Sequence, residues 1–256
     1  MDQRFTLALA ALVLVGGALA LWLSPQQQGP APVDPPVAPS APPQSYVLAI
    51  SWHPAFCESK PNLAECRIER STDYAADHFT LHGLWPDDEY CGVSDRLVSL
   101  DSDNRWEDLP EIDVSDSTWR NLQRVMPGTQ AQLERHEWLK HGTCADTSAE
   151  TYFARSIALL ETINASPIRD LLGRNIGKTV SRNQIRAAFD AAFGDGAGRK
   201  IRVDCDEDGS RTIISELRIN LDGDAMGRAS LADLIHSARN AGNGCASGIV
   251  DPAGRQ

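Results

Sequence analysis

Two histidines, a glutamate and a lysine fall within six consecutive residues of the segment HEWLKHGTC, residues 136–144. On an α-helix, where successive side chains are about 100° apart, His136, Glu137, Lys140 and His141 all lie on one arc of about 140°. Such a face carries groups that exchange protons near neutral pH and groups that bind anions. An ordinary amphipathic helix end with solvated charges is the alternative interpretation.

A third histidine, His82, lies in a segment of a different kind. Residues 79–85 alternate aromatic or apolar side chains with small or polar ones and stop at Pro86, which predicts a β-strand that leads into a loop. His82 lies in this strand, next to Gly83. A lone histidine is usually structural. Two histidine-bearing segments, one on a strand and one on a helix, are however the minimum needed to place two imidazoles on opposite sides of one reacting atom.

The elements that must position these groups follow from hydrophobic periodicity and capping residues. The predicted strands are residues 46–52, ended by His53-Pro54, residues 79–85, and a hairpin of residues 200–203 and 212–221 with residues 206–210 as its turn. The first predicted helix is capped by Asp116 or Ser117 and runs to about Met126, and the second begins at about residue 129 and ends at Gly142. Three further helices are predicted over residues 149–163, 181–193 and 231–239. Residues 101–116 are predicted to be acidic and irregular. Strands and helices are segregated, which favours an α+β fold with a central antiparallel β-sheet flanked by helices.

The N-terminal segment is expected to lie outside this fold. Residues 5–23 contain no charged side chain and would span about 28 Å as a helix, close to the thickness of a bilayer core. A small-x-small triplet at residues 18–20 resembles a cleavage site, so residues 1–23 are predicted to be a cleaved signal peptide or, alternatively, a membrane anchor. Residues 24–45 hold eight of the fifteen prolines and read as a linker, and residues 46–256 form the predicted catalytic domain.

Six cysteines fit an exported protein, because disulfides form in oxidising compartments. A local disulfide could close the polar loop between Cys57 and Cys66. Six cysteines nevertheless allow 15 pairings, and the sequence alone does not choose among them. There is no CxxC motif, which disfavours a zinc ribbon or a thioredoxin-type site.

Charge and spacing disfavour several other classes of site. The net charge of −11 argues against a broad basic surface for nucleic acid, although not against an enzyme that binds one or two phosphates locally. His136 and His141 resemble the HExxH motif, but their spacing of five places the imidazoles about 140° apart on a helix instead of about 40°. The DxDxDG run at residues 204–209 resembles the start of a calcium loop, but position twelve is Ser215 and a strand follows. We expect an acidic hairpin turn there, and no metal or cofactor.

The segments HGLWP, residues 82–86, and HEWLKHGTC, residues 136–144, resemble the two active-site segments of the ribonuclease T2 family. The family's segments read HGLWP and HEWxKHGTC, and both match without a substitution and in the same order. Residues 51–57 also resemble the end of the family's first strand, and the resemblance covers about residues 46–221. It implies a T2-like fold stapled by disulfides, and a periplasmic or secreted endoribonuclease that degrades RNA.

This resemblance implies a role for each residue of the two segments. His141 would remove the proton of the 2′-hydroxyl and His82 would protonate the departing 5′-oxygen, although the sequence does not orient the two. Lys140 would stabilise the added negative charge at phosphorus, Glu137 would orient or polarise its neighbours, and His136 would bind the phosphate. The product would be a 2′,3′-cyclic phosphate, and DNA, which lacks the 2′-hydroxyl, would not be cut.

Three residues after His82 are candidates for substrate binding. Trp85 could stack on a base, and Asp87 could accept a hydrogen bond from an exocyclic amine. Tyr90 is a further candidate of the same kind. Core packing for Trp85 and a solvated loop position for Asp87 are the alternatives.

Within this resemblance one disulfide has a clear use. Cys91 lies five residues after Pro86 and Cys144 three after His141, so a bridge between them would tie the two active-site segments together. The pair Cys57–Cys66 follows from proximity, and the pair Cys205–Cys245 remains.

The sequence therefore predicts an exported, metal-independent endoribonuclease of the T2 type that acts on single-stranded RNA as a monomer. Membrane attachment through the N-terminal segment is the alternative to release. A T2-like module that binds RNA or a protein without catalysis is a second reading, and a metal-dependent hydrolase is a third. The presence of all five expected catalytic residues argues against the binding module.

Overall fold

The computed structural model describes residues 45–67 and 70–254. The predicted signal or anchor, residues 1–23, and nearly all of the predicted linker lie outside the described residues. Within the described part of the chain, no helix is long and apolar enough to cross a membrane.

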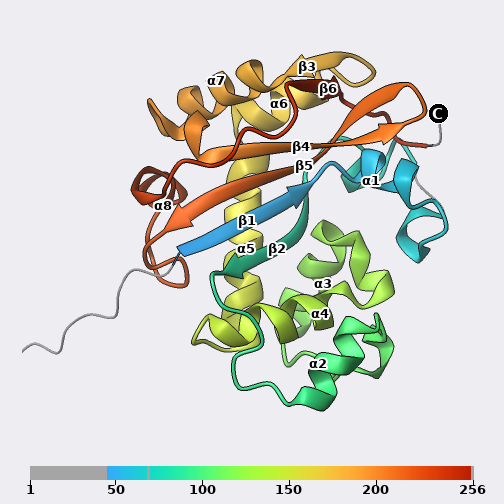
Figure 1. Ribbon diagram of the computed structural model, residues 1–256, viewed down its shortest axis with the longest axis vertical. Helices are drawn as coiled ribbons and strands as arrows, with labels where there is room; N and C mark the ends of the chain where they lie inside the picture. Colours follow the sequence, from blue (N-terminus) through green and yellow to red (C-terminus); the bar gives the residue numbers. More distant parts are fainter. Residues whose placement is uncertain (1–44, 68–69, 255–256) are drawn as a thin grey trace, which may run out of the picture. The chain divides into compact units, whose positions relative to one another are not determined.

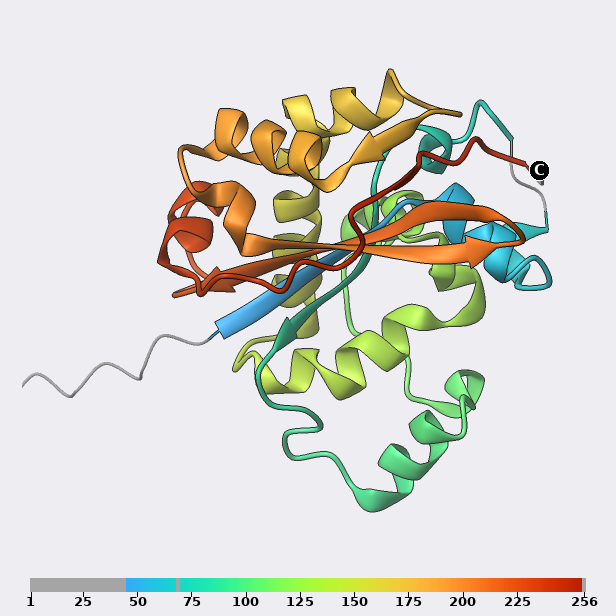
Figure 2. The same cartoon turned by 45° about the horizontal axis from the view of Figure 1, so that its top comes forward.

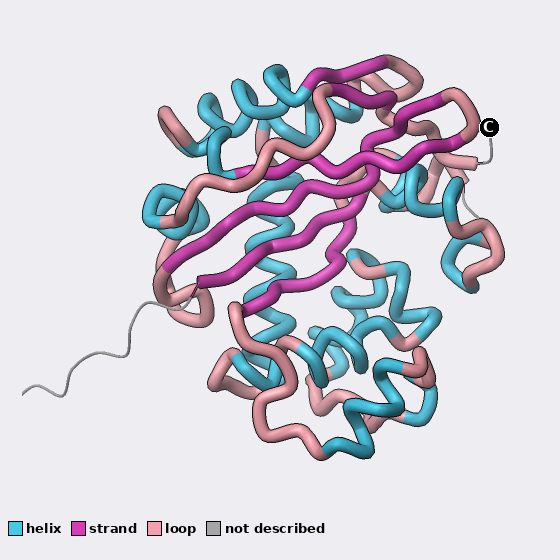
Figure 3. Tube along the Cα trace, in the orientation of Figure 1, coloured by secondary structure: helices cyan, strands magenta, loops and turns pink. Residues whose placement is uncertain are grey.

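A six-stranded sheet forms the centre of the fold (Figures 1 and 3). Its strand order is β2-β1-β5-β6-β3, and β4 pairs with β5 away from this path. The strands are β1 (Ser45–Ser51), β2 (Thr80–Pro86), β3 (Thr179–Ser181), β4 (Ile201–Asp208), β5 (Arg211–Asp222) and β6 (Ser247–Ile249). The predicted antiparallel sheet is correct for β1, β2, β4 and β5, but β6 runs parallel to β5, so the sheet is mixed.

Helices lie against one face of this sheet and at both of its edges. In Figure 1, α5 passes behind β1 and β2, α6 and α7 lie beside β3 and β6, and α2, α3 and α4 gather beyond β2; Figure 2 shows the same arrangement from a second direction. The helices are α1 (His53–Ser59), α2 (Asp95–Ser102), α3 (Asp116–Val125), α4 (Leu133–Lys140), α5 (Ala149–Asn164), α6 (Pro167–Gly173), α7 (Arg182–Phe193) and α8 (Leu231–Ser237). The α+β class predicted from the sequence is confirmed.

The core lies between the sheet and α5. Leu48 and Ile50 of β1 and Phe153 of α5 are fully buried, and each such side chain contributes about 1.5–3 kcal/mol through removal of apolar surface from water. A polar contact fixes the helix to the sheet, because the hydroxyl of Tyr152 donates to the carbonyl of Leu84 at 2.8 Å. The strand that carries His82 is therefore held from behind by α5.

Two elements differ from the sequence prediction because of proline and glycine positions. His53-Pro54 begins α1 instead of only ending β1, since proline fits the first turn of a helix, where no amide donor is required. The hairpin turn is also shorter than predicted. Strand β4 continues through Asp208, and the reversal occurs at Gly209, whose φ of 59° is the left-handed conformation that glycine adopts easily.

The shorter turn changes the interpretation of the acidic run. Asp204, Asp206 and Asp208 lie along strand β4 instead of around a loop. Nε of Arg202 donates to Asp204 at 2.6 Å, and Arg211 forms an ion pair with Asp208. The expectation of an acidic turn was therefore wrong, and Asp204 and Asp208 serve as partners of arginines on the hairpin.

All six cysteines are paired in the combination expected from the resemblance to the ribonuclease T2 family: Cys57–Cys66, Cys91–Cys144 and Cys205–Cys245. The second bridge joins the loop after β2 to the turn after α4. It therefore ties together the two segments that carry the histidines.

Candidate active site

Helix α4 and the residue that follows it supply four polar groups to one site, as predicted from their positions on a helix: His136, Glu137, Lys140 and His141. The regular helix ends at Lys140, and His141 caps it with helical backbone angles before a 3-10 turn over Gly142–Cys144. Gly142 thus ends the helix through packing and not through a left-handed conformation. A Cβ atom at this position would lie 2.2 Å from the ring of Trp138, so a side chain there would displace the indole.

Strand β2 brings His82 to this helix through a bulge. Gly83 pairs with Ala49 and Leu81 with Ile50, so His82 has no partner on β1 and is the extra residue of the bulge. Bulges bend a strand and redirect a side chain, and they are common beside active sites. Gly83 permits the side chain of Glu137 to lie against strand β2, because a Cβ atom at position 83 would lie only 1.8 Å from Oε2 of Glu137.

Glu137 is the centre of the site. Its side chain is fully buried, and Oε2 accepts a hydrogen bond from Nε1 of Trp85 at 2.8 Å. Oε1 lies 3.7 Å from Nε2 of His82 and 3.9 Å from Nε2 of His136. Burial raises the pKa of this carboxyl group to about 7, although His82 and the indole partly oppose the rise. Glu137 can therefore change its protonation state in the same pH range as the imidazoles.

His82 has a second carboxylate on its other ring nitrogen. Nδ1 lies 2.6 Å from Oε2 of Glu216, a nearly buried residue of β5. Because Nδ1 donates to that carboxylate, Nε2 is left to face Glu137 and the site. Burial alone would lower the pKa of His82, but the hydrogen bond to Glu216 and the negative charge of Glu137 outweigh burial and raise it.

Glu216 is itself held in place. Nε of Arg218, two residues further along β5, donates to Oε1 of Glu216 at 2.7 Å. Burial would raise the pKa of Glu216, but His82 and Arg218 lower it, so the group stays ionised. The guanidinium of Arg218 also lies over the ring of Trp85, 5.4 Å from its centroid.

His136 is positioned by a separate carboxylate. Nδ1 lies 2.8 Å from Oδ1 of Asp101, a buried residue of α2, and the hydroxyl of Tyr90 donates to Oδ2 of Asp101 at 2.7 Å. The indole of Trp106 stacks on the imidazole at 4.7 Å between centroids. Burial lowers the pKa of His136, and the bond to Asp101 only partly opposes it.

His141 has no such carboxylate. Its ring stacks on Trp85 at 5.4 Å, and within the described residues its buried Nδ1 has no hydrogen-bond partner. Burial, followed by the positive charges of Lys140, His136 and His82, lowers the pKa of His141 to about 3. This imidazole is therefore neutral over the whole physiological range.

Lys140 points toward the loop after β2. Its Nζ lies 3.4 Å from Oε1 of Glu89, and its carbonyl accepts a hydrogen bond from the amide of Tyr90 at 2.8 Å. Both contacts hold the loop between His82 and Cys91 against the end of α4.

The three residues expected to bind a base have different surroundings. Trp85 lies inside the histidine cluster and donates to Glu137, and Tyr90 has its hydroxyl on Asp101. Asp87 is exposed, with Arg239 3.5 Å away. Of the three, only Asp87 lies on the open surface of the loop.

Three residues of the site were not predicted from the sequence: Asp101, Glu216 and Arg218. Asp101 begins a stretch that reads as irregular, but it lies in the last turn of helix α2, most of which precedes that stretch. Glu216 did leave a signal, since it is an acidic residue inside a predicted strand, directly before the apolar Leu217. Nothing in the sequence indicates that its partner is His82, 134 residues earlier.

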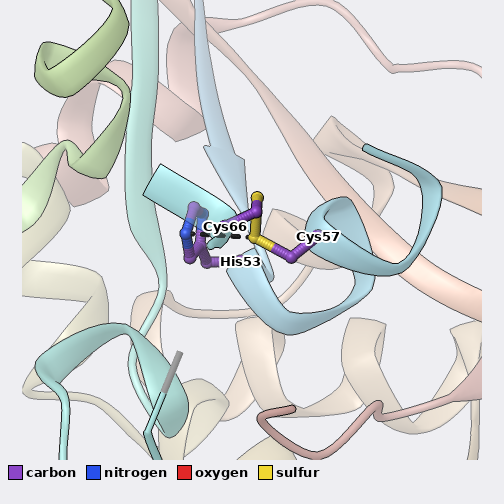
Figure 4. A group of neighbouring side chains, drawn as sticks. All are labelled: His53, Cys57 and Cys66. Carbon is purple, nitrogen blue, oxygen red and sulfur yellow. Dashed lines mark hydrogen bonds between the residues drawn. A yellow bond between two sulfur atoms is a disulfide. The ribbon is translucent and has the colours of Figure 1, made fainter. Parts of the chain in front are cut away.

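Within residues 45–67 and 70–254, two groups of residues have metal-ligand atoms within 4.8 Å of one another. One is His53, Cys57 and Cys66, shown in Figure 4, but both sulfur atoms belong to a disulfide and are not available as thiolates. The other is His136, Glu137 and His141, the residues that resemble HExxH. A metal-dependent hydrolase would have to use this second group.

Three comparisons relate the chain to known proteins. A model of the ribonuclease T2 family matches residues 44–230. Ribonuclease I of Escherichia coli is 31% identical over 238 residues, which are 82% of this chain and 86% of that protein. The crystal structure of Actibind, described as a T2 ribonuclease, superimposes with a TM-score of 0.52 at 23% identity over 83% of this chain and 88% of that one. RNase NT in complex with 5′-AMP gives a TM-score of 0.52 at 19% identity, over 82% of this chain and 98% of that one.

Proposed function

This chain belongs to the ribonuclease T2 family and is an endoribonuclease, and we propose that it cleaves single-stranded RNA through the 2′-hydroxyl, without a metal ion. One observation carries the mechanism: three imidazoles surround a buried carboxylate, and they differ in their carboxylate partners. His82 has Glu216 and His136 has Asp101, whereas His141 has neither.

This asymmetry supports an assignment of the two proton-transfer roles. A general base must start neutral, and His141, with its pKa lowered to about 3, is neutral. A general acid must start protonated, and the raised pKa of His82 favours imidazolium. His141 therefore takes the proton of the 2′-hydroxyl and His82 donates a proton to the departing 5′-oxygen. A very low pKa makes His141 a weak base before RNA binds, and the negative phosphate raises that pKa on binding.

The remaining groups act on the phosphate. His136 and Lys140 supply the donors and positive charge that a phosphorane with an added negative charge requires. Glu137, between His82 and His136, stabilises positive charge on both imidazoles and orients them. The products are a 2′,3′-cyclic phosphate and a free 5′-hydroxyl. DNA offers no nucleophile at the 2′ position and is not cleaved.

The contacts of the candidate base-binding residues support a narrower assignment than the sequence did. Trp85 and Tyr90 act mainly on Glu137 and Asp101. Asp87, on the exposed loop after β2, remains the candidate that accepts a hydrogen bond from a base.

The three disulfides support export, because such bonds persist in oxidising compartments. We place the enzyme in the periplasm or outside the cell, released by cleavage within residues 1–23 or attached to the membrane through them, and acting as a monomer.

Digestion of a defined RNA in the presence of EDTA, followed by end-group analysis, tests this function. We expect full activity and 2′,3′-cyclic phosphate ends. Loss of activity on chelation would favour a metal at His136, Glu137 and His141, and 5′-phosphate ends would contradict attack by the 2′-hydroxyl. If RNA binds but is not cut, the chain is a binding module. The variants His82→Ala and His141→Ala should each abolish cleavage.

A further inference from the structure

One face of the sheet beside the site carries polar side chains. On β5, Glu216, Arg218 and Asn220 alternate with the buried Leu217 and Ile219. Arg218 pairs in register with Arg202 of β4, and Glu216 with Asp204. Two arginines therefore lie directly opposite each other on this face, an arrangement of like charges that by itself destabilises a sheet.

A single carboxylate holds both guanidinium groups. Nε of Arg202 donates to Oδ1 of Asp204 at 2.6 Å, and Nε of Arg218 lies 3.2 Å from Oδ2 of the same side chain. Arg218 also donates from Nε to Glu216 at 2.7 Å. Each guanidinium is thus oriented through its Nε, the end nearer the backbone.

The outer ends of the two arginines remain available. In the described residues, the Nη groups of Arg202 and Arg218 make no hydrogen bond or ion pair, and the two side chains are 49% and 45% exposed. Two Nη groups form the planar fork with which arginine binds a phosphate through paired hydrogen bonds. A fork whose orientation is already fixed loses less entropy on binding.

The pair also lies next to the catalytic groups. Arg218 contacts the ring of Trp85, which in turn packs against His82 and His141. Arg218 is therefore separated from the histidines by one side chain, and Arg202 lies opposite Arg218 on the next strand. The net charge of the protein is −11, so phosphates away from the scissile bond need such a local pair of cations.

We propose that Arg202 and Arg218, held by Asp204, form a second phosphate site that binds a non-scissile phosphodiester of the RNA substrate. This proposal rests on the ribonuclease function proposed above. The second phosphate site raises kcat/KM on a long RNA relative to a short one through electrostatic contacts, which do not depend on the base sequence.

The test compares two substrates without terminal phosphates: UpU, which contains only the scissile phosphodiester, and hexauridylate. For Arg202→Gln, the ratio of kcat/KM on hexauridylate to kcat/KM on UpU should fall about tenfold, the loss expected for a charge-assisted hydrogen-bonded contact. The slope of log kcat/KM on hexauridylate against log salt should become shallower by about 0.7, the value for one phosphate contact on a single strand. Arg202→Lys keeps the charge without the fork, so it should keep the slope and lose less of the ratio.

Arg174→Gln is the matched control, since it removes an exposed arginine that follows the end of α6 and pairs with Asp170 of that helix. It should change neither ratio nor slope. If Arg202→Gln left the ratio of the two kcat/KM values unchanged, either because neither changed or because both fell equally, the second phosphate site would be contradicted. If the wild-type protein cleaves neither substrate, the ribonuclease function itself fails, so the two failures are distinguishable.

Discussion

Oε2 of Glu216, on β5, lies 2.6 Å from Nδ1 of His82, at a sequence separation of 134 residues. The carboxylate fixes which imidazole nitrogen faces the site and favours the protonated ring. In the proposed mechanism His82 is the general acid, which is active only while protonated, so its pKa would set the pH above which cleavage declines.

Replacing Glu216 with Gln tests this pairing. The variant loses the negative charge that raises the pKa of His82, so the alkaline limb of the kcat/KM profile should move to lower pH. The pH dependence of kcat/KM on UpU measures the shift. Glu207→Gln, on the exposed side of β4, is the control and should leave the limb in place. An unmoved limb in Glu216→Gln would show that His82 is not the acid that this profile reports.

Tyr90→Phe separates two roles for that side chain. The phenyl ring could still stack on a base, but it cannot donate to Asp101, which holds His136. We expect kcat/KM to fall about fivefold, a modest part of what a hydrogen bond to a charged group is worth. Steady-state kinetics on UpU would measure the fall, and undiminished activity would favour the stacking role. Tyr74→Phe, which removes a hydroxyl remote from the site, controls for general loss of stability.

Glu137→Gln should stabilise the protein and inactivate it. Burial raises the pKa of Glu137 from 4.5 to about 7, so the folded protein keeps a proton there that the unfolded chain releases as pH rises through this interval. Stability from this group is thus lost between about pH 4.5 and pH 7. A neutral glutamine removes the penalty, and the free energy of unfolding at pH 8 should rise by about 1–3 kcal/mol.

Urea denaturation at pH 8 and pH 4 would measure this difference, which should vanish at the lower pH. Glu111→Gln, at an exposed position, is the control with no expected effect. A variant less stable than the wild type at pH 8 would mean that attraction to His82 outweighs the cost of burial.

The disulfides should differ in their contribution to stability. In the chain-entropy estimate, the Cys91–Cys144 bridge, with a separation of 53 residues, contributes about 4 kcal/mol, and Cys57–Cys66, with a separation of 9, about 2.6 kcal/mol. The double alanine variants should lose stability in that order in urea. The Cys91 and Cys144 variant should also lose activity, because that bridge joins the two active-site segments. The opposite order of stability would contradict the loop-length argument.

The short motifs and the regular elements were predictable because each depends on neighbours in sequence. Strand β1 and helix α5 follow from local periodicity, and both histidine segments could be read directly. Asp101 and Glu216 could not be read in this way, since each acts on a histidine that the fold, not the sequence, brings beside it. The bulge at His82 was equally inaccessible, because it exists only in the pairing of β2 with β1.

Strand β1 is hydrogen-bonded on both sides, to β2 at one edge and to β5 at the other. Every imidazole of the site has been synthesised by residue 141, yet β5 begins only at Arg211. A chain still growing on the ribosome therefore carries the histidines of the site before it has β5, the strand that pairs with β1 and holds His82. Assembly of the site is tied to the end of synthesis, so an unfinished chain presents the reactive residues to surrounding RNA without the structure that makes them a nuclease.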